Sequence, residues 1–224
     1  MKYLIELNRK IEKCTICPRL VAFRESVARK KRKMFAHEDY WGKPVTGYGD
    51  PDAGLLIVGL APAAHGGNRT GRVFTGDKSA EFLMACLYEA GLSNQPSSIR
   101  RGDGLELIDG YMTPVLKCVP PHDKPTAEEL SNCFSYFEQE LSELRSLKVI
   151  IALGKVAFDS CLKYFHTHSP IIKKNYPFGH GNWYKMPGEH NLVSSFHPSP
   201  RNVNTKRLSQ EMMVSLLLSI KGVL

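Results

Sequence analysis

The chain has 224 residues, of which 42% are hydrophobic, 9% aromatic and 23% charged. A chain of this length can bury the core of one domain, and its apolar content excludes intrinsic disorder. The longest apolar stretch, residues 55–64, contains Gly59 and Pro62 and falls short of the roughly 20 residues that span a membrane. Since the N-terminus has no signal-peptide pattern either, we expect a soluble, intracellular (cytoplasmic) protein. We also expect a monomer.

The excess of positive charge lies in the first 33 residues. They hold 11 Lys and Arg against three Glu, whereas the rest of the chain holds 19 basic and 19 acidic residues. The segment ends in the run Arg29-Lys-Lys-Arg-Lys33. Such a run is either a solvated helix face or a site for a phosphate-rich partner, because clustered cations release counterions from nucleic acids. Charge alone leaves both interpretations open.

Apolar periodicity and turn residues divide the chain into alternating helices and strands. In chain order, the patterns predict helix 1–13, helix 19–33, loop 40–52, strand 55–60, helix 78–90, strand 111–117, helix 126–147, strand 148–153, helix 154–165, aperiodic segment 166–190, strand 191–196 and helix 205–220. Strands that alternate with helices form a parallel sheet with helices on both faces. We therefore expect an α/β fold with four parallel strands, in a single domain that spans residues 1–224.

Six cysteines in a chain without an export signal argue against a disulfide framework. Cys14 and Cys17 form a C-x2-C pair, and Cys118 and Cys133 form a second pair with fourteen residues between them. Four thiolates can bind zinc or an iron–sulfur cluster, and the spacing leaves both open. The other two cysteines lie in apolar helical patterns and are expected to be small core residues: Cys86 and Cys161.

Three of the four predicted strands run into unusual polar loops, at residues 61–77, 118–125 and 197–202. Ligands of open parallel sheets bind where the strands end, so we expect these loops to form one site. The first loop is rich in glycine, which lets the backbone approach an anion or a flat ring. It matches neither a Walker A loop nor the dinucleotide motif G-x-G-x-x-G.

Single residues of these loops also have purely structural interpretations. Asp77 directly precedes an apolar helix, where an aspartate is a good N-cap. Phe74 is suited to a core position, and His197 precedes a proline, as residues in turns often do. Each of the three could therefore serve the fold alone.

Residues 41–51, 59–77 and 197–202 carry specific motifs. They read Trp41-Gly-Lys-Pro-Val-Thr-Gly-Tyr-Gly-Asp-Pro51, then Gly59-Leu-Ala-Pro-Ala-Ala-His-Gly-Gly-Asn-Arg-Thr-Gly-Arg-Val-Phe-Thr-Gly-Asp77, then His197-Pro-Ser-Pro-Arg-Asn202. Together they resemble the type-B (family 5) uracil-DNA glycosylases, and the resemblance extends from Cys14 to the last helix. It implies a three-layer α/β/α fold with a central four-stranded parallel sheet. It also implies a DNA glycosylase of base excision repair, which hydrolyses the bond between sugar and base after the nucleotide is flipped out of double- or single-stranded DNA.

The resemblance also implies roles for individual residues. Asp77 would position or deprotonate the attacking water, and His197 would donate a hydrogen bond to the departing base. A 4Fe–4S cluster would be held by Cys14, Cys17, Cys118 and Cys133, two of them from the basic segment 1–33. The flipped base would lie against Ala63, Phe74, Asp123 and Asn202. DNA phosphates would be bound, at the start of the last helix, by Arg201, Lys206 and Arg207.

Two departures from better-known uracil-DNA glycosylases bear on the substrate. The loop after the first strand, residues 60–64, supplies no acid or amide, which is typical of type B. Asp123 stands where type-B members have asparagine, so a second carboxylate near Asp77 could raise the pKa of one of the two. Small Ala61, Ala63 and Ala64 reject an added methyl group poorly, so we expect uracil and other deaminated bases, such as hypoxanthine, to be substrates.

Two other classes of protein remain as alternatives. One is a non-catalytic DNA- or nucleotide-binding module with a structural metal site. The other is a Rossmann-like nucleotide enzyme, which would need the phosphate fingerprint and the acidic ribose partner that the chain lacks. An assay on uracil-containing DNA separates the glycosylase from the binding module.

Overall fold

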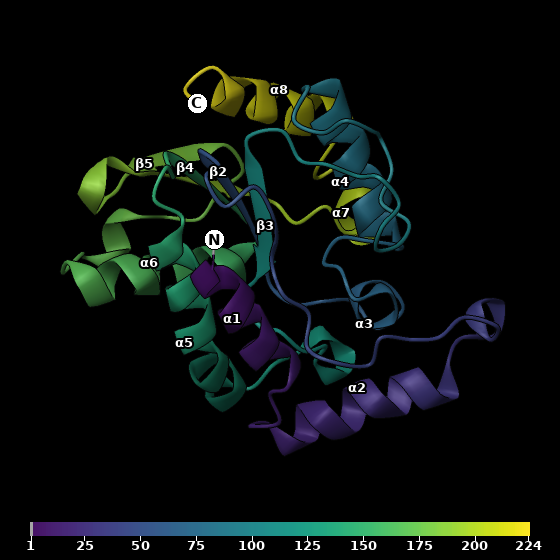
Figure 1. Ribbon diagram of the computed structural model, residues 1–224. Coiled ribbons are helices and arrows are strands. Elements are labelled where there is room, and N and C mark those ends of the chain that lie inside the picture. Colours follow the sequence, from purple (N-terminus) through teal and green to yellow (C-terminus); the bar gives the residue numbers. More distant parts are fainter. Residues whose placement is uncertain (1) are drawn as a thin grey trace.

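The computed structural model describes residues 2–224, and its centre is one sheet of six strands (Figure 1). The spatial order of the strands is β1-β3-β2-β4-β6-β5. The strands are β1 (Tyr48–Gly49), β2 (Leu55–Gly59), β3 (Gly110–Pro114), β4 (Val149–Leu153), β5 (Asn182–Lys185) and β6 (Asn191–Ser195). The four inner strands are parallel, whereas the two edge strands pair antiparallel with their neighbours.

The predicted α/β class is confirmed, but the predicted count of four strands is wrong. The four inner strands lie where the apolar runs predicted them. The two edge strands lie in segments 40–52 and 166–190, which carry no apolar run. Each is short and only partly buried, and β5 alternates between half-buried and exposed residues. Edge strands of this kind leave no continuous hydrophobic signal in the sequence.

Helices cover both faces of the sheet. α1, α5 and α6 share a hydrophobic core with one face, and α4 and α8 share a core with the other (Figure 1). The helices are α1 (Lys2–Glu12), α2 (Pro18–Lys30), α3 (Gly67–Thr70), α4 (Lys78–Glu89), α5 (Ala127–Glu143), α6 (Lys155–His168), α7 (Pro200–Asn204) and α8 (Gln210–Lys221). Short 3-10 turns occur at η1 (Lys33–Phe35), η2 (Pro121–Asp123), η3 (Lys173–Asn175) and η4 (Pro187–Glu189). Within residues 2–224, no helix combines the length and the apolar character that crossing a bilayer requires.

Residues that alternate along the inner strands face opposite helical layers. On β2, Leu55 and Ile57 pack with α4 and α8, whereas Leu56 and Val58 pack with α1, α5 and α6. All four side chains are buried. A strand buried on both faces reads as a continuous apolar run, which is why these strands could be recognised from the sequence.

The last predicted helix, residues 205–220, begins too early. The chain forms two helices here, α7 capped by Ser199 and α8 capped by Ser209. Between them, Lys206 has φ 56°, a left-handed conformation that interrupts a helix. Apolar periodicity does not register a turn made by polar residues.

A buried ion pair joins the end of β3 to α5. Lys117 and Glu140 are in contact and almost inaccessible to solvent. The Lys117 ammonium also donates to Thr113 Oγ1 and to the Pro114 carbonyl, both at 2.8 Å. The Gly47 N–H donates to Glu140 Oε1 at 3.3 Å. The pair therefore binds three separate segments of the chain together.

We predict that Glu140→Ala strongly destabilises the protein, because the ammonium of Lys117 is left buried without its carboxylate. The free energy of unfolding should fall by about 3–5 kcal/mol. Urea unfolding followed by circular dichroism measures it. Glu143→Ala, in the last turn of the same helix, is the control and should change stability by less than about 0.5 kcal/mol. Equal effects of the two substitutions would contradict the prediction.

Candidate active site and metal centre

A cavity of about 400 Å³ opens at the edge of the sheet where the parallel strands end. The three loops that the sequence singled out converge there, as the ends of parallel strands must. Its lining comprises Leu60, Ala61, Ala63, Ser79, Pro120, Asp123, His197, Ser199 and Pro200. The structure thus brings Ala63, Asp123 and His197 together around one space.

Asp77 caps α4 and is not among the residues that line this cavity, although Ser79, two residues further on, is. Its Oδ1 accepts a hydrogen bond from the Ala80 N–H at 3.0 Å, so the structural interpretation of Asp77 is confirmed. Its Oδ2 lies against Gly66, where an added Cβ would come within 2.0 Å. Burial raises the pKa of the Asp77 carboxyl, while the backbone N–H groups of Ala80 and Ser79 lower it. The cap leaves Oδ2 on the side of the glycine-rich loop.

His197 stands at the end of β6 as a neutral imidazole. Burial lowers its pKa to about 4, although the nearby carboxylate of Asp123 acts in the opposite direction. A Cβ added to Gly154 would meet the His197 Cβ at 3.4 Å, an ordinary contact, so it is the positive φ of 98° that favours glycine there. The side-chain amide of Asn202 donates to the His197 carbonyl at 2.8 Å. Asn202 therefore holds the histidine loop, and its amide is engaged with backbone.

The core interpretation of Phe74 is confirmed. Its side chain is 7% exposed and belongs to the core that contains α4 and α8. Its ring lies 6.0 Å from the His197 ring, between centroids, with an angle of 31° between the planes. The ring covers Gly59, where an added Cβ would approach it to 2.7 Å. The Phe74 ring therefore lies between β2 and the His197 ring.

Asp123 is exposed and acts on His197, not on Asp77. It lies in η2, where both His122 and Asp123 have left-handed backbone conformations, with φ 54° and 55°. The like charge that raises the pKa of Asp77 is Glu81, on the next turn of α4. The expected coupling of the two aspartates is thus not found, and the charge of Asp123 acts on the His197 imidazole instead.

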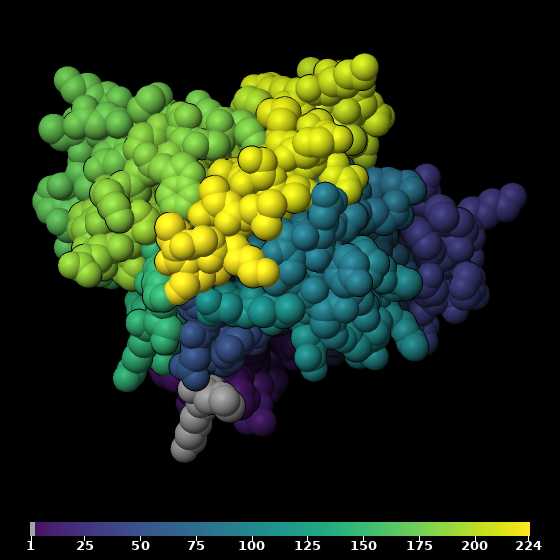
Figure 2. Space-filling view, turned by 90° about the horizontal axis from the view of Figure 1, so that it is seen from above, coloured from purple at the N-terminus to yellow at the C-terminus, as the bar shows by residue number. Residues whose placement is uncertain are grey.

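The cationic residues near the cavity are exposed, but they do not begin the last helix. Arg201 lies in α7, and Lys206 and Arg207 lie in the turn before α8. The Arg207 guanidinium stacks over the Phe196 ring at 4.3 Å. The basic run 29–33 closes α2, and the purple-blue segment that contains it projects from one side of the molecule (Figure 2).

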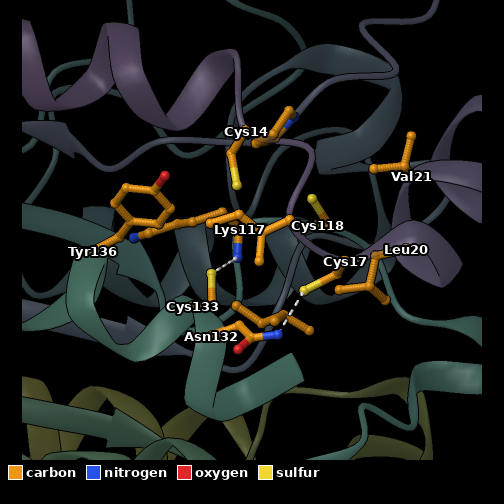
Figure 3. Close-up of a pocket in the computed structure, with 12 residues that line it drawn as sticks. Cys14, Cys17, Leu20, Val21, Lys117, Cys118, Asn132, Cys133 and Tyr136 are labelled. Atoms are coloured by element: carbon orange, nitrogen blue, oxygen red, sulfur yellow. Dashed lines mark hydrogen bonds between the residues drawn. The ribbon is translucent and has the colours of Figure 1, made fainter. Parts of the chain in front are cut away.

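Four cysteine side chains gather between α2 and α5. Cys14 and Cys17 come from the turn before α2, Cys118 follows β3, and Cys133 lies on α5; all four line one cavity (Figure 3). Cys86 and Cys161 are fully buried in the two hydrophobic cores, as predicted. The basic N-terminal segment therefore does contribute half of the thiols.

Hydrogen-bond donors surround these sulfur atoms. The Lys117 N–H donates to Cys133 Sγ at 3.3 Å, and the Asn132 amide donates to Cys17 Sγ at 3.7 Å (Figure 3). The buried Arg24 guanidinium donates to Cys118 Sγ at 3.1 Å through Nη1. Its Nε is buried without an acceptor among residues 2–224. Arg24 is thus a buried cation beside four thiols, with one N–H group, at Nε, that has no acceptor. Such a cation fits an anionic metal–thiolate group.

The arrangement of the thiols bears on which metal group they could hold. In a tetrahedral zinc site each sulfur lies about 2.3 Å from one ion. Across the described part of the chain, no three His, Cys, Asp or Glu side chains converge on a point where a single ion would be bound. The four cysteines line one cavity, and thiolates are ligands of both zinc and iron–sulfur groups.

Sequence reasoning missed Arg24 as part of this centre. The charge pattern places it among the cations of a basic helix, yet it is only 4% exposed. A signal was present, because Arg24 lies four residues after the buried Leu20 and so on the same face of α2. An arginine in line with a core residue needs a buried acceptor.

The chain is similar to known proteins over most of its length. A model of the uracil DNA glycosylase superfamily matches residues 46–221. The chain is 47% identical over 208 residues to a type-5 uracil-DNA glycosylase of Thermus thermophilus, across 93% of this chain and 92% of that protein. For a type-5 enzyme of Pyrobaculum aerophilum the identity is 44% over 211 residues, across 94% and 88%. A type-4 enzyme of the same organism is 31% identical over 155 residues, across 69% and 62%.

The chain therefore belongs to the uracil DNA glycosylase superfamily. Within it, the chain is a member of the type-5 uracil-DNA glycosylases, the family that its three motifs predicted.

We predict that each of the four cavity cysteines is needed to bind metal. Replacing Cys14, Cys17, Cys118 or Cys133 by Ser should sharply lower the metal content of protein purified without oxygen. Cys86→Ala and Cys161→Ala are controls, since alanine leaves no buried hydroxyl without a partner. Elemental analysis by mass spectrometry measures the outcome. Full metal content in any of the four serine variants would exclude that residue as a ligand.

Proposed function

We propose that this protein is a uracil-DNA glycosylase of base excision repair, with Asp77 and His197 as its catalytic residues. The observation that carries the proposal is their placement: the neutral imidazole of His197 lines the strand-end cavity, and the carboxylate of Asp77 lies two residues before Ser79, which also lines it. The chain is a member of the type-5 family. The reaction is hydrolysis of the bond between C1′ of deoxyribose and the base. A base in the stack is out of reach, so the nucleotide is flipped into the cavity.

The two residues act on opposite charges. As the bond to the base breaks, positive charge develops on the sugar and negative charge on the base. Oδ2 of Asp77 orients a water molecule toward C1′, takes its proton as the oxygen bonds to the sugar, and stabilises the cationic sugar. The neutral imidazole of His197 donates a hydrogen bond to the base oxygen that gains charge, as donors of an oxyanion hole do.

The walls of the cavity hold the base. Phe74 offers its ring, and stacking of a base on an aromatic ring is worth about 1–3 kcal/mol. Ala63 forms a small apolar wall, and Asn202 supports the loop of His197 through its backbone. Asp123 brings a carboxylate to the rim, where it acts on His197 and reaches the edge of the base.

Small apolar walls make the substrate range broad. A pocket that rejects a base only by its size discriminates weakly, because one extra methylene changes the binding free energy by only about 1–3 kcal/mol. Ala61, Ala63 and Ala64 have no side-chain donor or acceptor with which to read the base edge. We therefore propose that hypoxanthine and other deaminated bases are removed as well, more slowly than uracil.

We propose a 4Fe–4S cluster as the group held by Cys14, Cys17, Cys118 and Cys133. The support is the set of four thiols around a cavity, the N–H donors to their sulfurs and the buried Arg24 cation. When bound, such a cluster supplies a cross-link between α2, the loop after β3 and α5. Hydrolysis of a glycosidic bond transfers no electrons, so its contribution is structural.

We propose that the protein acts as a monomer in the cytoplasm, on double- or single-stranded DNA. One chain supplies every residue of the proposed site, and the substrate is genomic DNA. Arg201, Lys206 and Arg207 bind phosphates close to the flipped nucleotide, and the run 29–33 binds phosphates farther along the strand.

The decisive experiment is an excision assay on matched duplexes that carry uracil, hypoxanthine or thymine opposite guanine, with enzyme in excess. Alkali breaks the strand at abasic sites, and the rates rank the bases. Rapid cleavage at uracil and slower cleavage at hypoxanthine are expected. DNA binding without any cleavage would overturn the proposed activity, and cleavage at uracil alone would show that Asp123 or another group reads the base edge.

We predict that Asp77→Asn abolishes most of the activity but preserves the fold. Asparagine keeps the oxygen that caps α4, so only the charge is lost. The single-turnover rate should fall roughly 10²- to 10⁴-fold, as for other acid–base groups, with unchanged affinity for product DNA. Asp50→Asn, which alters an exposed aspartate outside the site, should keep the full rate. Full activity of Asp77→Asn would leave capping as the role of Asp77.

We predict that His197→Ala lowers the single-turnover rate about 10²- to 10³-fold, as the loss of one oxyanion donor does elsewhere. Since the pKa of His197 is lowered to about 4, the imidazole is neutral at both pH 6 and pH 8. The loss should therefore be equal at the two pH values, with His166→Ala as the control. A larger loss at pH 6 would indicate that the protonated imidazole acts.

We predict that the basic run makes DNA binding sensitive to salt. Replacing Lys30, Lys31, Arg32 and Lys33 by Gln should lower the slope of log K against log salt by about 0.9 for each phosphate that the variant no longer neutralises. Binding is measured by fluorescence anisotropy at several salt concentrations. The matched control changes four lysines outside the basic run, in α6, η3 and β5: Lys163, Lys173, Lys174 and Lys185. Equal slopes in all three proteins would make the run a solvated face.

A further inference from the structure

A second buried arginine, Arg69 of α3, braces the peptide that carries Asp77. Its side chain is 6% exposed. Nη2 donates to the Gly76 carbonyl at 2.9 Å, directly before Asp77, and Nε donates to the His65 carbonyl at 2.7 Å. One planar guanidinium therefore joins both ends of the glycine-rich loop. Gly76 and the Arg69 guanidinium lie in close contact, because a Cβ on Gly76 would come within 2.3 Å of Nη2.

The other side of Arg69 contacts the segment that follows the basic run. Nη1 is paired with the carboxylate of Glu38, and the guanidinium lies over the ring of Phe35 at 3.9 Å from its centroid. Phe35 ends η1, which begins at the last residue of the basic run. The same guanidinium thus touches both the segment that follows the basic run and the glycine-rich loop that ends at Asp77.

We propose that Arg69 is a positioning residue for Asp77, which holds the carboxylate in place at the start of α4, with Glu38 and Phe35 holding Arg69 itself. This inference rests on the proposed role of Asp77. Positioning of Asp77 requires the planar guanidinium of arginine. A lysine ammonium could not reach the carbonyls of His65 and Gly76 and the carboxylate of Glu38 together.

The electrostatic part has a defined sign. The charged groups that act on the Asp77 carboxyl are Arg69 from α3, which lowers its pKa, and Glu81 from α4, which raises it. Removing the positive charge of Arg69 should shift the acid limb of the rate to higher pH. Neutralising Glu38, the counter-ion of Arg69, should strengthen the field of Arg69 at Asp77 and shift the limb to lower pH.

The test is the pH dependence of the single-turnover rate on uracil-containing duplex DNA. The acid limb of the unaltered protein is first assigned to Asp77 by its loss in Asp77→Asn. Arg69→Gln should lower the plateau rate and move the limb to higher pH. Arg69→Lys should keep the limb in place but lower the plateau roughly 10- to 100-fold, as small displacements of a reacting group do. Glu38→Gln should move the limb to lower pH.

Lys78→Gln is the matched control, because Lys78 is an exposed cation next to Asp77 that is paired with Glu81. It should move the limb less than Arg69→Gln does. A limb that stays in place in both Arg69→Gln and Glu38→Gln overturns the inference, as does a full plateau rate in Arg69→Lys. If Arg69→Gln does not fold, Arg69→Lys and Glu38→Gln decide alone. Absence of cleavage by the unaltered protein would instead overturn the proposed function.

Discussion

The buried ion pair between Lys117 and Glu140 is the interaction on which the arrangement of both sites depends. It fixes the chain at the point where β3 ends, one residue before Cys118 and six before Asp123. Glu140 lies two turns after Cys133 on α5, so the same pair sets the distance between two of the four thiols. A charged pair without access to water tolerates little displacement, because either partner alone would be costly to bury. The apolar sheet supports both sites, but this ion pair fixes the position at which the loop after β3 begins.

Burial acts on the two proposed catalytic groups in opposite directions. Removing water from His197 keeps its imidazole neutral, so that it can donate a proton in a hydrogen bond without carrying charge beforehand. Removing water from Asp77 raises the pKa of a group that must be ionised. Arg69 and the N–H groups at the start of α4 oppose that shift. The capping position thus also stabilises the carboxylate, which reconciles the structural and the catalytic interpretation of Asp77.

The sequence could predict what depends on local periodicity and could not predict what depends on contacts between distant segments. The inner strands were recognisable because Leu55, Leu56, Ile57 and Val58 must all be apolar to face two helical layers. β5 was not recognisable, because its residues alternate between half-buried and exposed and form no continuous apolar run. At the strand ends, spacing and motifs selected three loops that converge on one cavity. The consecutive left-handed residues of η2, which turn Asp123 toward His197 and away from Asp77, carry no periodic signal. Neither does the turn at Lys206, which divides the predicted long helix into two.

A short series of hydrogen bonds through α2 joins the four cavity thiols to the cavity at the strand ends. Arg24 donates to Cys118 Sγ with its side chain, and its carbonyl accepts from the Asn68 amide at 3.2 Å. The N–H of Asn68 donates in turn to the carbonyl of Ala63, a wall of the base cavity, at 3.0 Å. Because α2 is anchored at its start by Cys17 and continues at its end into the basic run, one helix connects the thiols, the cavity wall and the cationic surface. A group bound by the four thiols would therefore serve the active site without taking part in its chemistry, by fixing the helix against which the glycine-rich loop is built.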